Sequence, residues 1–447
     1  MRSPLGIKRT GLRLLLALVG VLASPLGFAC RDLGQFYGII DNDPAIAIQD
    51  LNAILDACYD DSEYFALLGS AYLRQGDLLR ALESLERSLL LDPQNGSAAL
   101  DFAEVLYRQG QSLNAIEINS GLLAREDLPQ GLRESIILRQ RLWRRSTSQK
   151  SLSLGISAGH DNNLNSAPIA DQLALTLSGN PVILDVNSEF KAAGAAYTRV
   201  NASGTIAKLG QNVNSQLTGN FSGRYSKNSD YELLQTSLRY RLSDASDAPI
   251  WNATIGADHL EWGGSPVFSS ATLRAGYLLR DFGSCSVHSR VAMQYQLYHA
   301  QKLLSGYEYS LGAGTDCGFA LGGAVNRIGL EVSALRNHAK YPGRLGADRD
   351  GWQTNAFWQR PFGLGQIFAQ YQHSKFSDEE GYSPLFKNGA RRNERLHSLY
   401  FSYAYPLQAF GSGARFVSTI AYHNQTSSIT LFRTRGASAE IGLFWGF

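Results

Sequence analysis

Hydrophobic and polar residues alternate with a period of two over most of the chain, from about residue 149 to the end. In the last stretch, residues 434–447, one face carries Ala, Ile, Leu and Trp, and the other carries mostly Gly, Ser and Glu. This alternation is typical of a β-strand with one apolar face. Fourteen such stretches follow one another, so the pattern predicts fourteen antiparallel strands.

The polar faces of these strands carry Ser, Thr, Asn, Gln and Arg, as at Gln294 and Gln296. Apolar side chains outside and polar ones inside are the pattern of a transmembrane β-barrel, which must close because lipid offers a sheet edge no hydrogen-bond partner. We expect the second strand at about 190–202. Links alternate in length, and we expect the short ones (281–283, 360–363, 406–412) to be periplasmic and the long ones (162–187, 337–349, 377–392) extracellular.

Residues 31–146 instead show a helical period. The segment 62–95 fits a tetratricopeptide repeat, in which small residues let two helices approach and larger ones fill the space between them. A second copy begins 34 residues later but has Asn119 where a large apolar residue is usual, and a truncated copy precedes the first. A basic helix at 132–145 is expected to cap the array. The repeat positions are Leu68, Gly69, Tyr72, Gly76, Asp77, Ala81, Leu85 and Pro93.

Repeat arrays of this kind leave a concave face that commonly binds protein. A stack of helical hairpins without a partner is the alternative. The positions expected to face a partner are Arg74, Glu104, Tyr107 and Arg108.

Residues 1–29 have the features of a cleaved signal peptide: a basic start, an apolar stretch at 14–23 and a small-x-small site at 27–29. A membrane anchor is the alternative, but the apolar stretch is short for one. After residue 30 no run approaches the ~20 apolar residues of a membrane helix. We therefore expect a signal peptide at 1–29, a periplasmic helical domain at 30–148 and a barrel at 149–447.

The four cysteines form two candidate pairs. Cys285 and Cys317 lie equally far from residue 301 in a predicted hairpin, so a cross-strand disulfide is expected, with two buried thiols as the alternative. Cys30 follows the cleavage site and is either lipidated or free to pair with Cys58, because the periplasm permits disulfides.

Composition excludes few functions but offers little catalytic chemistry. Lys and Arg number 41 against 39 Asp and Glu, which gives no reason to expect nucleic acid as a partner. A G-x-S-x-G match at 155–159 lies inside a predicted strand, whereas a nucleophile elbow needs a strand, a turn and a helix. The eight histidines show no metal-binding spacing, and no phosphate-binding glycine loop is present. We expect no enzyme, metal or cofactor; the enzyme class left open is an outer-membrane phospholipase, because Ser and His both lie on barrel strands.

The link after the first strand is dense in Asp and Asn. A loop that only satisfies its own backbone is one interpretation, and a functional extracellular motif is the other. Its residues are His160, Asp161, Asn162, Asn163 and Asn165.

The combination of signal peptide, short repeat array and about fourteen strands resembles the surface lipoprotein assembly modifier (Slam) family. The segment 159–168 is similar to a G-Y-D-x-N-x-N element of that family, with His160 in place of Tyr, and the helical part is shorter than usual. The final Phe447 resembles the terminal aromatic insertion signal of outer-membrane barrels. The resemblance implies an outer-membrane translocon, whose repeats bind an exported client: a surface lipoprotein or a soluble haem-acquisition protein. Outer-membrane lipid and the barrel-assembly machinery are the other expected partners.

Two alternatives stay open on the sequence. A polysaccharide-export porin also joins helical repeats to a barrel, and a passive porin could use its repeats only for assembly.

Overall fold

The computed structural model describes residues 30, 32–246, 249–411 and 413–447. The predicted signal peptide lies outside the described residues. The chain divides into two compact units, Met1–Trp143 and Arg144–Phe447. Within the described residues, no helix has both the length and the apolar character needed to cross a membrane.

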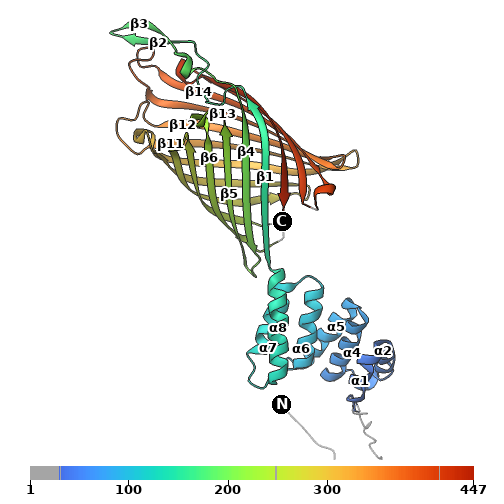
Figure 1. The fold of residues 1–447 in the computed structure, drawn as a ribbon. Coiled ribbons are helices and arrows are strands. Elements are labelled where there is room, and N and C mark those ends of the chain that lie inside the picture. Colours follow the sequence, from blue (N-terminus) through green and yellow to red (C-terminus); the bar gives the residue numbers. More distant parts are fainter. Residues whose placement is uncertain (1–29, 31, 247–248, 412) are drawn as a thin grey trace, which may run out of the picture. The chain divides into compact units, whose positions relative to one another are not determined.

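The helical unit consists of short helices arranged as antiparallel pairs (Figure 1). Side-chain caps define several of their starts: Asp61, Asp77 and Asn95 each accept a backbone N–H from the first turn that follows. Gly76 ends one helix in the left-handed conformation, with φ 91°. The helices are α1 (Gln35–Asn42), α2 (Pro44–Ala53), α3 (Leu55–Cys58), α4 (Ser62–Gln75), α5 (Leu78–Leu91), α6 (Gly96–Arg108), α7 (Ser112–Leu123) and α8 (Gln130–Ser146).

Helices α4 and α5 form the predicted first full repeat. A Cβ added to Gly69 would lie 2.5 Å from Leu85, so glycine is required for the close approach of the two helices. The truncated upstream copy is tied to this pair by Tyr64, whose buried hydroxyl donates to the carbonyl of Leu51 at 3.0 Å. Helices α6 and α7 form the second repeat, and α8 follows it as the predicted terminal helix.

Fourteen antiparallel strands form a closed barrel, as predicted. Each strand pairs with its sequence neighbours, and β1 closes the sheet by pairing with β16 from Ser153↔Gly446 to Asp161↔Ser438. The barrel strands are β1 (Ser148–Asp161), β4 (Ala195–Lys208), β5 (Val213–Ser226), β6 (Leu233–Asp244), β7 (Trp251–Trp262), β8 (Ser265–Asp281), β9 (Cys285–Tyr298), β10 (Gly306–Leu321), β11 (Ala324–Ala339), β12 (Arg349–Phe362), β13 (Gly365–Gly381), β14 (Arg391–Pro406), β15 (Ala414–Ser427) and β16 (Thr434–Gly446).

The two faces of the barrel wall differ as the alternation predicts. On β1, Leu152, Leu154 and Ile156 point outward and are 42–49% exposed, whereas Gly155 and Ser157 are buried on the inner side. The same parity continues through the paired strands, so the apolar side chains form the outer surface, and pairs such as Arg239–Asp258 and Arg290–Glu331 lie on the lumenal side. A closed barrel with this polarity is the architecture of an outer-membrane β-barrel protein.

The longest links, 162–194, 340–348 and 382–390, all lie at one end of the barrel, which we call the long-link end. The opposite, short-link end holds the start of β1. One connection at the long-link end is nonetheless tight, because Gly263 and Gly264 both adopt positive φ and join β7 to β8 directly.

Two details of the first long link differ from the prediction. The link contains an additional hairpin, β2 (Gln172–Leu177) and β3 (Asn180–Asp185), joined by Ser178 and Gly179 with positive φ (Figure 1). The predicted second strand also starts too early. Barrel strand β4 begins at Ala195 because the segment before it bonds to the loop that follows β1 instead of extending the ladder.

Candidate functional site

A row of charged side chains runs along helices α4, α6 and α8 of the helical unit. Asp101 of α6 is its central member: it hydrogen-bonds the Ser70 side chain of α4 and lies within electrostatic reach of Arg74 and Arg139. Burial raises the pKa of the Asp101 carboxyl above its ordinary value, and these partners oppose that shift. We call Arg74, Asp101, Glu104, Arg108 and Arg139 the charged row.

Helix α8 docks on the second repeat through polar and stacking contacts. The Arg139 guanidinium donates to Asn119 Oδ1 at 2.7 Å, and Gln140 donates to the Ser120 hydroxyl at 2.8 Å. Trp143 stacks on Tyr107 with 4.7 Å between ring centroids. Asn119, the residue that departs from the repeat pattern, is fully buried. Its side chain provides the acceptor for the half-buried guanidinium of Arg139.

The four residues predicted to face a partner fall into two groups. Tyr107 is occupied by its stack with Trp143, and Glu104 lies between Arg108 at 2.8 Å and Arg139 at 4.0 Å. Arg74 and Arg108 keep much of their side chains exposed, although Arg74 also reaches Asp41 at 3.2 Å. Asp101 joins the two groups and was not among the predicted residues, because a single Asp on a helix gives no sequence signal.

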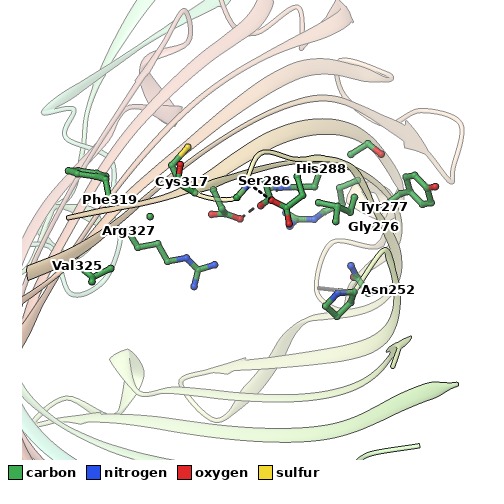
Figure 2. Close-up of a pocket in the computed structure, with 18 of the residues that line it drawn as sticks. Asn252, Gly276, Tyr277, Ser286, His288, Cys317, Phe319, Val325 and Arg327 are labelled. Atoms are coloured by element: carbon green, nitrogen blue, oxygen red, sulfur yellow. Dashed lines mark hydrogen bonds and ion pairs between the residues drawn. The ribbon is translucent and has the colours of Figure 1, made fainter. Parts of the chain in front are cut away.

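In the barrel, a cavity of about 860 Å³ opens within the lumen near the short-link end (Figure 2). Arg327 extends into this space from β11, and Asn252 borders it from β7. Its charged and polar lining also includes Arg241, His288 and Asp316. The lining therefore combines arginine and other polar side chains with apolar ones such as Phe319 and Val325.

Lumenal charges are partly neutralised by cross-strand pairs. Arg239 of β6 reaches Asp258 of β7 at 2.8 Å, and Glu331 of β11 pairs with Arg290 of β9. The barrel closes where β1 pairs with β16, and we call this junction the seam. There, Glu440 of β16 accepts hydrogen bonds from the Ser157 hydroxyl at 2.6 Å and the Tyr197 hydroxyl at 2.9 Å. Ser157, the serine of the G-x-S-x-G match, thus lies within the continuous strand β1 and not at a strand–turn–helix elbow.

Toward the long-link end, the inner wall carries a compact ion-pair cluster. Asp378 of β13 is fully buried and lies 3.1 Å from Arg392 of β14 and 3.0 Å from Arg349 of β12. The link 340–348 folds against it, since a Cβ on Gly346 would come into contact with the Asp378 carboxylate. Arg344 of the same link is also buried and donates to Asn337 Oδ1 of β11, so a hydrogen bond ties this loop to the inner wall.

Another part of the inner wall is aromatic. Phe357, Phe368 and Tyr400 lie on the neighbouring strands β12, β13 and β14, with 6.3 Å between the first two ring centroids and 6.1 Å between the last two. The Arg327 guanidinium lies over Phe357 at 5.7 Å. The two-residue period places these rings on the inner face, where the sequence predicts mainly polar side chains, so an aromatic group there differs from that expectation.

The Asp- and Asn-rich residues after β1 join the first long link to the barrel seam through hydrogen bonds. Asn163 is buried: its amide donates to the carbonyls of Ala167 and Arg435. Asn162 accepts the backbone N–H of Ala437, and Asn165 bonds both Lys191 and Ala193.

Of the remaining two motif residues, one bonds to the backbone and the other is exposed. Asp161 accepts the backbone N–H of Asn163, and His160 is exposed. These side chains are used mainly to satisfy backbone groups, as in the first of the two interpretations of the loop.

Both cysteine pairs are bonded in the structure. Cys285 and Cys317 occupy directly paired positions of β9 and β10, and Cys30 joins Cys58 of the helical unit. Among the described residues, no group of three His, Cys, Asp or Glu side chains is placed to hold a metal ion.

No family model matches the sequence, and no curated protein matches it. The helical unit is similar to solved structures of helical-repeat proteins. One is the type III secretion translocator chaperone SycD of Yersinia enterocolitica, at 19% identity over 26% of this chain and 84% of that one, with a TM-score of 0.23. The Arabidopsis OM64 TPR domain is similar at 14% identity over 24% of this chain and 90% of that one, with a TM-score of 0.23.

Proposed function

We propose that this outer-membrane barrel protein is a translocon that delivers exported client polypeptides to the cell surface. The helical unit would capture the client in the periplasm, and the barrel would provide the route or the insertion platform. The resemblance to the Slam family supports the same function, with a surface lipoprotein or a soluble haem-acquisition protein as the client.

The observation that carries the proposal is the charged row on α4, α6 and α8. Its central carboxylate, Asp101, is half-buried between Arg74 and Arg139, so it is fixed in place, while Arg74 and Arg108 stay open to solvent. Alternating fixed charges along one side of a repeat array suit an extended polypeptide, whose own charges and backbone carbonyls they can pair with.

The barrel is compatible with a polypeptide route because its inner wall carries many polar and charged side chains, several of them held in pairs such as Arg239–Asp258 and Arg290–Glu331. No phosphate-binding loop is present in the sequence to couple nucleotide hydrolysis to transport. The direction of transport would therefore come from folding of the client outside the cell.

Site-specific photocrosslinking tests the capture step. A photoreactive phenylalanine placed at Arg108 of the full chain should form adducts with an exported polypeptide in the native host. The control position is Glu86, which is exposed on α5, outside the charged row. Adducts that are absent at Arg108, or equal at Glu86, would contradict capture by the charged row.

A second candidate function rests on the aromatic inner wall. Successive rings of Phe357, Phe368 and Tyr400 at about 6 Å spacing could stack on the apolar faces of sugar rings, which favours a polysaccharide-export porin. Substitution of Phe368 by Ala would then reduce a cell-surface polysaccharide and leave surface proteins unchanged. The opposite result would leave the protein translocon as the better account.

A further inference from the structure

Ser269, on the outer wall of the barrel, lies between two histidines. Its hydroxyl oxygen is 2.8 Å from Nδ1 of His259 and 2.8 Å from Nε2 of His299. Nε2 of His259 lies in turn 3.3 Å from the carboxylate of Glu261. The four side chains come from β7, β8 and the first residue after β9, and they converge because Ser269 is the direct cross-strand partner of His259.

The strand pattern places this cluster on the lipid-facing side. On β7, His259 and Glu261 follow Ile255 with the same parity, and on β8 Ser269 shares its face with Leu273; both apolar side chains are 59% exposed. The cluster lies a few residues from the Gly263–Gly264 turn, and therefore at the long-link edge of the apolar band. Polar and ionisable groups on the lipid face of a barrel are destabilising, so such a group at this position calls for a functional reason.

The three contacts fix which group donates and which accepts in each hydrogen bond. An ionised Glu261 can only accept, so Nε2 of His259 carries the proton that it donates. Nδ1 of a neutral His259 is then an acceptor, and the Ser269 hydroxyl must donate to it. The remaining contact is completed by His299, whose Nε2–H donates to the Ser269 oxygen. A hydroxyl that donates to a carboxylate-supported imidazole is the arrangement of an activated serine nucleophile.

The geometry points to an ester hydrolase site on the outer surface of the barrel, with the acyl ester of a membrane lipid as its substrate. The substrate class follows from the location, because the hydroxyl faces the layer in which lipid ester groups lie. Phospholipids and lipopolysaccharide both carry such esters, and the experiment distinguishes them. This site is independent of the translocon function and departs from the prediction that the chain has no enzymatic activity.

In the acylation step, the Ser269 oxygen attacks the ester carbonyl carbon, and its proton passes to Nδ1 of His259. His299 Nε2–H is the donor available to the developing oxyanion. The ester C–O bond then breaks, and the leaving alkoxide takes the proton from His259. Water, with His259 as base, releases the fatty acid and restores Ser269. Glu261 is a positioning residue that holds His259 in the required tautomer.

The test uses the purified full-length protein in detergent micelles. Fatty-acid release is measured from dipalmitoyl phosphatidylethanolamine, from lipopolysaccharide and from an ether-linked phospholipid that lacks the ester carbonyl. Reaction with a fluorophosphonate probe, mapped by mass spectrometry, reports the nucleophile directly. Retention of the heat-sensitive gel migration of a folded barrel confirms that each variant is intact.

We expect release from at least one ester lipid and none from the ether lipid, with the probe adduct on Ser269. Ser269→Ala should abolish labelling, and His259→Ala should reduce release by about 100-fold or more. Glu261→Gln should lower kcat with little change in KM. The matched control is His397→Ala: this histidine also faces outward, but the hydroxyl that it contacts is the phenol of Tyr371.

Release from phospholipid alone or from lipopolysaccharide alone would identify the lipid source, and either supports the site. Absence of both ester hydrolysis and probe labelling in the wild-type protein would overturn it. Labelling that persists in the folded Ser269→Ala variant, or an equal loss of activity in His397→Ala, would overturn it as well.

Discussion

The side-chain amide of Asn163 donates to the backbone carbonyl of Arg435 at 3.0 Å, which joins the link after the first barrel strand to the start of the last one. The same side chain satisfies both the N–H and the carbonyl of Ala167. Asn163 is buried, so none of these bonds can be replaced by water without local opening. The long-link edge of the seam therefore depends on this residue.

Substitution of Asn163 by Ala should destabilise the barrel by about 1–3 kcal/mol, because it leaves buried backbone groups without partners. The measurement is the temperature at which the heat-sensitive gel migration is lost. His160→Ala, at an exposed position of the same motif, is the control and should behave like the wild type. Equal behaviour of both variants would show that the motif does not hold the seam.

The contact between Asn119 and Arg139 allows a similar test in the helical unit. Asn119→Leu restores the large apolar residue of the repeat pattern but leaves the guanidinium of Arg139 without its acceptor. Loss of a hydrogen bond to a charged group should cost about 1.5–3 kcal/mol. Thermal unfolding of the full chain in detergent, followed at 222 nm, reports the helices. A variant as stable as the wild type would mean that α8 does not depend on this bond.

Asp101 makes helical stability dependent on pH. Burial raises the pKa of its carboxyl in the folded protein. The protonated Asp101 carboxyl therefore contributes to the stability of the folded protein. This contribution is fully present below the unfolded-state pKa and is lost as pH rises through the folded-state pKa. Asp101→Asn mimics the protonated form, so it should unfold at a higher temperature than the wild type at neutral pH, and the difference should vanish below about pH 4. A difference that does not change with pH would contradict this explanation.

Asp378 should control the width of the lumen. Its carboxylate pairs with both Arg349 and Arg392, and its removal leaves Glu394 as the carboxylate partner of two partly buried arginines, which should destabilise the cluster. Asp378→Ala should release the link 340–348 and increase the conductance and its fluctuations in planar bilayers. Asp258→Ala, which breaks the more exposed pair with Arg239, is the control and should have a smaller effect.

The fourteen strands and their inner and outer faces could be predicted from the sequence, because a two-residue period fixes which side chains face lipid. The repeat array was also predictable, since Gly69 and Leu85 fall at the spacing that lets two helices approach. Both signals arise from neighbouring residues in the chain.

The parts that were missed depend on contacts between distant segments. The β2–β3 hairpin has only a short sequence signal, Ser178-Gly179 between alternating residues, and this signal does not distinguish a hairpin from a long link. The hydrogen bonds of Asn163 become visible only when residues 272 positions apart meet at the seam. His259, Ser269 and His299 lie on different strands, and no spacing in the sequence connects them.

The most direct test of the account is the set of proteins exposed on intact cells of the native host. Peptides released by an external protease would be quantified by mass spectrometry in wild-type cells, in cells lacking this chain, and in cells carrying the charge-reversed variant Arg74→Glu with Arg108→Glu. We predict that at least one exported polypeptide leaves the surface and accumulates in the periplasm in both altered strains. An unchanged set of surface proteins would contradict the translocon account, and a loss of surface polysaccharide alone would favour the export porin.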